Sequence, residues 1–247
     1  MKSSSLLPAV FLGMSLFYLA SCGEQTDQNK EMTDSVTTDT ASSATTAPAP
    51  SPIVTTPQNM MIVKHKVTNF DKFLSSYEAH DSLRLANGIH SYVIGRAVKD
   101  PNMVLVATKV DDIDKAKAFS KSADLRQAMQ KAGVAGKPSI SFTTMTYQDT
   151  SNVSTDLRSE TTFTVKDFDN WQKSFDSSRQ VRLDNGLMER AYGHDVDNNK
   201  KVTLVVAVTD TAKANAFWKS DQLKKLRAAS GATSEPDRYV FRIVKRY

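Results

Sequence analysis

The chain contains one segment twice, and this duplication constrains its fold more than any other feature. Residues 67–142 align without a gap to residues 165–240, and 22 of the 76 aligned pairs are identical. The motif Arg-Leu-x-Asn-Gly, followed by a further Gly, occurs at Arg84–Gly95 and again at Arg182–Gly193. Self-similarity at a fixed offset of 98 residues indicates two copies of one structural unit that pack against each other.

Each copy has the pattern of a strand, a helix, two strands, a helix and a strand. In the first copy an extended segment at 61–67 is followed by Asn69, an N-cap residue type, and by aromatic residues at helical spacing. Asn87-Gly88 ends this helix, and Gly133 ends the second one. The order βαββαβ predicts an α+β fold of two tandem ferredoxin-like modules. Each sheet has one face without helices, so we expect the two bare faces to cover each other in one intramolecular barrel.

The N-terminal part of the chain has a different character. The apolar run Leu6–Leu19 is shorter than the roughly 20 residues that a membrane-spanning helix needs, and it is typical of a signal peptide. It ends in Leu19-Ala20-Ser21-Cys22, which resembles the bacterial lipobox, where a lipoprotein is cleaved and its cysteine lipidated. Gly23, rather than Asp, follows this cysteine, which resembles the pattern of lipoproteins sorted to the outer membrane. We therefore expect a lipid on Cys22 as the membrane partner and a location in the bacterial cell envelope.

These patterns predict four segments. They are a lipoprotein signal peptide at 1–21, a disordered Ser/Thr/Pro-rich linker at 22–58, module 1 at 59–150 and module 2 at 151–247. The net charge is +5, and the acidic linker leaves the two modules distinctly basic. A basic module can attract an anionic ligand or membrane, or can present a solvated Lys/Arg surface. Nucleic acid is not an expected partner of an exported, lipid-anchored chain.

Candidate site residues come from the strands. The four histidines lack metal-ligand spacing, so no metal is expected. Strict alternation along the second strands of the two copies places two sets of side chains on one face: His90, Tyr92, Ile94 and Arg96, and Met188, Arg190, Tyr192 and His194. If this face points into the barrel, it forms the polar end of an apolar pocket; if it points outward, it faces solvent. The candidate ligand-binding residues are His65, His90, Tyr92, Arg96, Arg190, Tyr192 and His194, and no catalytic residue is assigned.

Arg84 and Arg182, the arginines of the repeated motif, have two interpretations. They could bind a ligand carboxylate, or they could lie near a helix C-terminus and pair with a carboxylate such as Asp112 or Asp210. A residue kept in both copies favours the second, structural role.

The repeated string F-D-x-[FW]…R-L-x-N-G…G…K-A-x-A-F-x-K-S…G…P resembles the dimeric α/β-barrel superfamily, in the group related to antibiotic-biosynthesis monooxygenases. The resemblance implies the barrel fold. Members of this superfamily include cofactor-free oxygenases and haem-degrading or haem-dependent enzymes, so the resemblance also raises these activities as alternatives. Haem-degrading members use an Asn, a Trp and a His. The first strands predicted here, 61–67 and 161–165, contain no Asn, and His65 of the first copy is replaced by Phe163 in the second.

The function expected from these observations is binding of a small, mostly apolar, anionic ligand in the barrel of a lipoprotein that is a monomeric pseudo-dimer without a cofactor. One alternative is a cofactor-free monooxygenase or a haem-handling enzyme; another is a structural envelope protein with a filled barrel. Because Tyr92 aligns with Arg190 and Arg96 with His194, we also expect chemically different barrel ends and one ligand site per chain.

Overall fold

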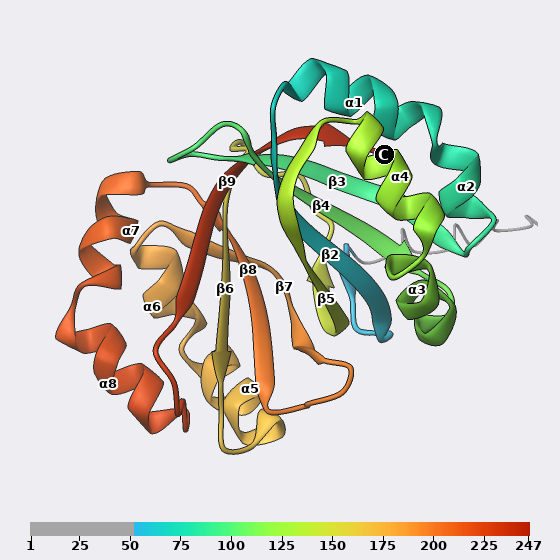
Figure 1. Ribbon diagram of the computed structural model, residues 1–247. Helices are drawn as coiled ribbons and strands as arrows, with labels where there is room; N and C mark the ends of the chain where they lie inside the picture. The colour runs from blue at the N-terminus through green and yellow to red at the C-terminus, as the bar shows by residue number, and fades with distance from the viewer. Residues whose placement is uncertain (1–51) are drawn as a thin grey trace, which may run out of the picture. The chain divides into compact units, whose positions relative to one another are not determined.

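The computed structural model describes residues 52–247, which belong to one compact unit (Figure 1). The predicted signal peptide, the lipidation site Cys22 and most of the predicted linker lie outside the described residues, and these three stay predictions. Within residues 52–247 no helix is long and apolar enough to cross a membrane.

Both modules have the predicted βαββαβ order, except that each helical connection contains two helices. Module 1 consists of β2 (Gln58–Val67), α1 (Phe70–Ala79), α2 (Asp81–Leu85), β3 (Ile89–Ala97), β4 (Met103–Val110), α3 (Ile113–Ser120), α4 (Ala123–Lys131) and β5 (Val134–Asp149). Module 2 consists of β6 (Leu157–Thr164), α5 (Phe168–Ser177), α6 (Arg179–Asp184), β7 (Leu187–Asp195), β8 (Lys201–Val208), α7 (Thr211–Trp218), α8 (Asp221–Ala229) and β9 (Asp237–Arg246).

The helices begin where the sequence places cap residues. Asn69 and Asp167 accept hydrogen bonds from the backbone N–H groups of Lys72 and Asn170, as an N-cap side chain does. The predicted second helix of module 1 is divided because Ser122 caps a new helix, accepting a hydrogen bond from the N–H of Leu125. Ser220 divides the equivalent helix of module 2 in the same way.

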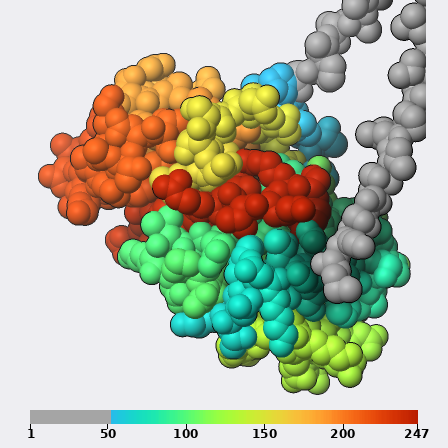
Figure 2. Space-filling view, turned by 90° about the horizontal axis from the view of Figure 1, so that it is seen from above, coloured from blue at the N-terminus to red at the C-terminus, as the bar shows by residue number. Residues whose placement is uncertain are grey.

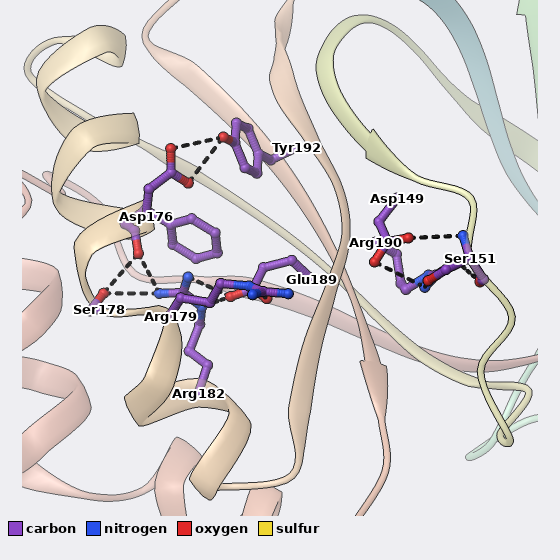
Figure 3. A network of polar contacts seen from close by, with 10 residues as sticks. Asp149, Ser151, Asp176, Ser178, Arg179, Arg182, Glu189, Arg190 and Tyr192 are labelled. Atoms are coloured by element: carbon purple, nitrogen blue, oxygen red, sulfur yellow. Dashed lines mark hydrogen bonds and ion pairs between the residues drawn. The ribbon is translucent and has the colours of Figure 1, made fainter. Parts of the chain in front are cut away.

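The repeated Arg-Leu-x-Asn-Gly motif joins the helices to the sheet. The guanidinium of Arg84 stacks on the Tyr77 ring and donates to the carbonyl of Tyr77 and to Asp81. Arg182 does the same at Phe175 and forms a buried ion pair with Glu189 of β7 (Figure 3). The predicted structural role is therefore confirmed, while the predicted partners Asp112 and Asp210 are wrong, because both cap helices instead.

The asparagine and glycine of the motif close the helix. The side-chain amide of Asn87 donates to the carbonyl of Leu83, and Asn185 does so to Val181. Gly88 and Gly186 follow with φ of 65° and 70°, the left-handed conformation that glycine adopts at least cost. The motif occurs twice because each module must turn from its helix into the second strand in the same way.

Eight strands form a closed barrel with the helices outside. Each module has the strand order of a ferredoxin-like sheet, β5-β2-β4-β3 and β9-β6-β8-β7. The two sheets are joined by antiparallel pairing of β3 with β9 and of β5 with β7. Figure 1 shows α1–α4 over the module 1 sheet and α5–α8 over the module 2 sheet, so that the faces without helices are turned inward. The predicted intramolecular α/β barrel is confirmed.

The barrel has a pseudo-twofold axis that runs along its length. Every neighbouring pair from β2 through β4, β3 and β9 to β6 is antiparallel, so β2 and β6 point in the same direction. The pairing between the modules follows the same offset of 98 residues. Arg96 of β3 pairs with Arg242 of β9, and their equivalents, His194 of β7 and Thr144 of β5, pair with each other. Equivalent residues of the two modules therefore lie at the same end of the barrel, and the prediction that the modules give its two ends different chemistry is wrong.

The apolar core has an outer and an inner part. The outer parts lie between each sheet and its helices and include Val104 with Phe119 in module 1 and Val202 with Trp171 in module 2. The inner part lies inside the barrel and comes from both modules, with Met60, Ile62, Leu105, Met145 and Phe241 as its buried members.

The last residues of the predicted linker are ordered, which corrects that boundary. Ile53–Val54 forms the short strand β1, which pairs with Gln148 and Asp149 at the end of β5. The strand β2 also begins earlier than predicted and includes Asn59, whose side chain accepts a hydrogen bond from Thr144. An Asn is thus present in this first strand, contrary to the prediction, and it serves to hold β2 against β5.

Candidate functional site

The candidate residues of the second strands do not share one face, because each strand contains a β-bulge. The register shifts between Ser91 and Val93 in β3 and between Glu189 and Ala191 in β7. An extra residue reverses the inward and outward sides of the strand beyond it. Of the seven candidates, Tyr92 and Arg190 are the two that line the barrel interior.

The other candidates of module 1 lie away from the interior cavity. His90 pairs with Asp111 at 2.8 Å, and its side chain is about half exposed. Arg96 lies on the ring of Phe70 and donates to the carbonyl of Pro101. Both residues have structural partners, and neither contacts the cavity that Tyr92 lines.

In module 2 the remaining candidates belong to the outer side of the sheet. Tyr192 is 2% exposed, packs against Trp171 and donates to Asp176 (Figure 3). His194 packs edge-on against Phe168. These contacts stabilise the helix α5 on the sheet, so the prediction that Tyr192 and His194 face the barrel ligand is wrong.

One end of the barrel contains a partly open cavity of about 100 Å³, which we call the barrel-end cavity. It lies where β2 and β6 begin and where β5 and β9 end. Its apolar wall includes Met60, Ile62, Leu105, Met145, Val205 and Phe241, and its polar wall consists of Tyr92, Gln148, Asp149, Arg158, Glu160, Arg190 and Arg246.

The charge in this cavity is asymmetric about the pseudo-twofold axis. Module 2 contributes Arg158, Glu160, Arg190 and Arg246. The equivalent residues of module 1, at the same end of the barrel, are Met60, Ile62, Tyr92 and Gln148. The two copies therefore share the fold and differ in chemistry at this position.

Arg158 is the least compensated charge of the cavity. It is 3% exposed, and one guanidinium nitrogen, Nη1, donates to the carbonyls of Thr155 and Leu157. No carboxylate of residues 52–247 lies within ion-pair distance of it. Burial, together with the positive charges of Arg246 and Arg190, lowers the pKa of Arg158 to about 10, so that it remains charged at neutral pH.

The other two arginines of the cavity have acidic partners. Arg190 lies 3.4 Å from Asp149 and donates to the carbonyl of Ser151, and it points to the opposite side of β7 from Glu189 (Figure 3). Arg246 lies 3.6 Å from Asp156. Asp156 belongs to the segment that joins the two modules, and Arg246 belongs to the C-terminal strand β9. Figure 2 shows this segment, drawn in yellow, beside β9, drawn in red.

Glu160 marks the inner limit of the cavity. It is 3% exposed and forms an ion pair of 2.8 Å with Lys64, which reaches it from β2 on the other side of the axis. Burial raises the pKa of Glu160, against the opposing effect of Lys64. Beyond this pair lies a second cavity of about 130 Å³ with a mostly polar wall.

A separate cavity of about 70 Å³ lies between the sheet and the helices of module 1, where His65 forms part of the wall. His65 is 4% exposed, and neither ring nitrogen has a hydrogen-bond partner. Desolvation lowers its pKa to about 4, so the imidazole is neutral at physiological pH. The equivalent cavity of module 2, about 90 Å³, has Phe163 in this position.

Haem does not fit the two helix–sheet cavities as they stand. Drug-sized ligands occupy cavities of roughly 300 Å³ or more, and a haem is larger still, whereas the two helix–sheet cavities measure about 70 and 90 Å³. Within residues 52–247 no three His, Cys, Asp or Glu side chains come together as metal ligands would.

Sequence reasoning missed Arg158, Glu160 and Arg246, the residues that make the barrel-end cavity charged. The first strand of module 2 was predicted to begin at Thr161, but β6 begins at Leu157. A signal is available if the offset of 98 residues is extended before the aligned segments, because Arg158 then replaces Met60 and Glu160 replaces Ile62. Such exchanges of an apolar for a charged residue on equivalent strands indicate that the two copies differ in chemistry at this end of the barrel.

Comparisons with known proteins bear on the fold. No family model matches the sequence, and no curated protein matches it either. An anthrone oxidase-like protein of known structure has a TM-score of 0.54 at 11% identity, over 79% of this chain and 96% of that one. A "putative monooxygenase" from Lactobacillus acidophilus has a TM-score of 0.50 at 12% identity, over 76% of this chain and 94% of that one. The chain thus has, in one polypeptide, the dimeric α/β-barrel fold built from two ferredoxin-like modules.

Proposed function

We propose that this protein binds a small, mostly apolar, anionic ligand in the barrel-end cavity. The observation that carries the proposal is Arg158, a buried guanidinium without a carboxylate partner within residues 52–247. A buried charge that lacks a counter-charge is unfavourable unless another group supplies it. An anionic ligand would do so.

The size of the cavity limits the ligand. A cavity of about 150 Å³ is known to hold benzene, and the barrel-end cavity measures about 100 Å³. The wall includes Met60 and Met145, whose flexible thioether side chains adapt to different shapes. These dimensions favour an anion with an apolar part of only a few carbons.

His65 is poorly suited to act as the general base that the enzymatic alternative would need. A general base works best when its pKa lies near the working pH, whereas the pKa of His65 is about 4. An imidazole with this pKa is a weak proton acceptor at neutral pH. The alternative of a filled, purely structural barrel is disfavoured by the cavity and its uncompensated charge.

The proposed cellular setting is the bacterial envelope, with the barrel anchored through a lipid on Cys22. This part rests on the sequence Leu19-Ala20-Ser21-Cys22.

The substitution Arg158→Met tests the proposal, because Met60 already occupies the equivalent position in module 1. Butanoate is the probe and 1-butanol its uncharged analogue, with binding measured by NMR titration. Removal of a charge-assisted hydrogen bond costs about 1.5–3 kcal/mol, so we expect butanoate affinity to fall about tenfold or more. The affinity for 1-butanol should change little.

Unfolding by denaturant provides a second measurement on the same variant. Replacing a buried charge with an apolar side chain is often neutral or stabilising, so Arg158→Met should not lower the free energy of unfolding.

Lys109→Met serves as the control for butanoate binding, since Lys109 lies over the Tyr92 ring but does not line the cavity. Undiminished butanoate binding by Arg158→Met would contradict the proposal.

A further inference from the structure

The three arginines of the barrel-end cavity are not equivalent. Arg190 has Asp149, and Arg246 has Asp156, each within ion-pair distance. Arg158 has carbonyl partners alone among the described residues. Two of the three arginines are thus paired with a carboxylate, and the positive charge of Arg158 remains for a ligand.

The free edge of Arg158 has a defined shape. Its Nη1 is used by the two carbonyls, whereas Nε and Nη2 have no hydrogen-bond partner within residues 52–247. These two nitrogens lie side by side on one edge of the planar guanidinium. Two parallel N–H donors on such an edge match the two oxygens of a carboxylate.

Asp149 is placed to keep Arg190 from serving as a second anion-binding group. Its side chain is 9% exposed. Burial opposes its charged form, but hydrogen bonds from Ser151 and the charge of Arg190 outweigh this and hold the pKa of Asp149 below its usual range. Asp149 is therefore ionised at neutral pH, and its negative charge also faces any ligand that carries more than one charge.

We propose that the barrel-end cavity selects a monocarboxylate with a short apolar chain, held by the free edge of Arg158, and that Asp149 excludes dianions. The inference rests on the proposed function and names its ligand class. A doubly ionised phosphate or phosphonate would bring a second negative charge, which finds no unpaired guanidinium and is repelled by Asp149.

Three probes with the same propyl tail separate the effects of charge and of apolar contact. Butanoate carries one charge, 1-butanol none, and propylphosphonate two at alkaline pH. For the unmodified chain we expect NMR titration to show butanoate binding about tenfold or more tightly than either of the others, the margin that a charge-assisted hydrogen bond gives.

The variant Asp149→Asn should then change the charge preference. It removes the carboxylate that occupies Arg190, so propylphosphonate affinity should rise about tenfold relative to butanoate. Asp184→Asn is the matched control, since Asp184 is exposed and accepts a hydrogen bond from Gln180. If loss of Asp149 disturbs the pairing of β1 with β5, Asp156→Asn frees Arg246 instead and should shift the preference in the same direction.

The possible failures are distinguishable. If propylphosphonate binds the unmodified chain as tightly as butanoate, and Arg158→Met abolishes both, the proposed function stands and the charge selectivity is overturned. An unchanged preference in Asp149→Asn and Asp156→Asn would likewise overturn the role of these carboxylates. If none of the probes binds, or if Arg158→Met has no effect on binding, the proposed function itself fails.

Discussion

Two buried polar residues, His65 and Arg158, lack a partner that such groups normally have. Neither ring nitrogen of His65 has a hydrogen-bond partner, and Arg158 donates to two carbonyls but has no carboxylate within ion-pair distance among residues 52–247. Each has an apolar equivalent in the other module, Phe163 and Met60. His65 was predicted as a candidate because it lies on the first strand of the first copy, where the second copy has Phe163. Arg158 was not, because it lies before the predicted start of its strand, and alternation could not reveal the bulges that turn Tyr192 and His194 outward.

The substitution His65→Phe should raise stability and reduce its dependence on pH. The folded chain holds His65 neutral down to about pH 4, while the unfolded chain takes up a proton near pH 6.5, so acid favours unfolding between these values. The shift corresponds to a loss on the order of 3 kcal/mol across this window and to none above pH 6.5. Urea denaturation at several pH values should show a steeper decline for the unmodified chain. An equally steep decline in His65→Phe would contradict the low pKa of His65. The control is His90→Phe, at a half-exposed position.

At the scale of elements, the caps and the glycine stops could be predicted because local chemistry decides them. The strand order could be predicted because it follows from the βαββαβ pattern. The helix breaks were less visible, since Ser122 and Ser220 lie within continuous apolar periodicity. Barrel closure depends on the later glycine of the repeated motif. A Cβ at Gly193 would lie 2.0 Å from the carbonyl oxygen of Thr144, in the backbone of β5. At Gly95 it would meet the ring of Phe241 instead, at 2.2 Å.

Gly193→Ala should therefore destabilise the protein more than Gly95→Ala. At Gly95 the backbone lies farther away, with the carbonyl oxygen of Arg242 at 3.2 Å, so a shift of the Phe241 side chain within the core can make room. At Gly193 the backbone of β5 can move only if the pairing of β5 with β7 opens. Overpacking commonly costs about 1–3 kcal/mol, and we expect Gly193→Ala at or above the upper end of this range. The measurement is the free energy of unfolding in urea. Equal costs at the two glycines would show that closure at β5–β7 is not as rigid as the backbone contact implies.

At the scale of the whole molecule, the duplication alone predicted that one chain would form the complete barrel. It could not predict that the pseudo-twofold axis runs along the barrel, because this depends on which edge strands pair. Each module leaves an apolar sheet face and two strand edges that only the other module covers. Neither module on its own satisfies these groups.

Residues 52–150 and 151–247, expressed separately, should each self-associate or aggregate. Mixing the two should restore a soluble one-to-one complex, because both strand pairings and the inner core are intermodular. Analytical ultracentrifugation of the separate halves and of the mixture measures this. A half that stays monomeric and soluble alone would refute the need for the shared barrel.

The axis along the barrel has a consequence for how such a site can arise. In a homodimer of identical subunits, every residue beside the axis is present twice, so a subunit like module 2 would bring two copies each of Arg158, Arg190 and Arg246 to the same opening. Six guanidinium groups would repel one another there. Covalent fusion of two copies lifts this restriction, because one copy can keep Met60, Ile62, Tyr92 and Gln148 while the other acquires charge. Symmetry breaking of this kind lets one chain form a single, directional binding site, whereas a homodimer of one module presents such residues only in pairs related by the twofold axis.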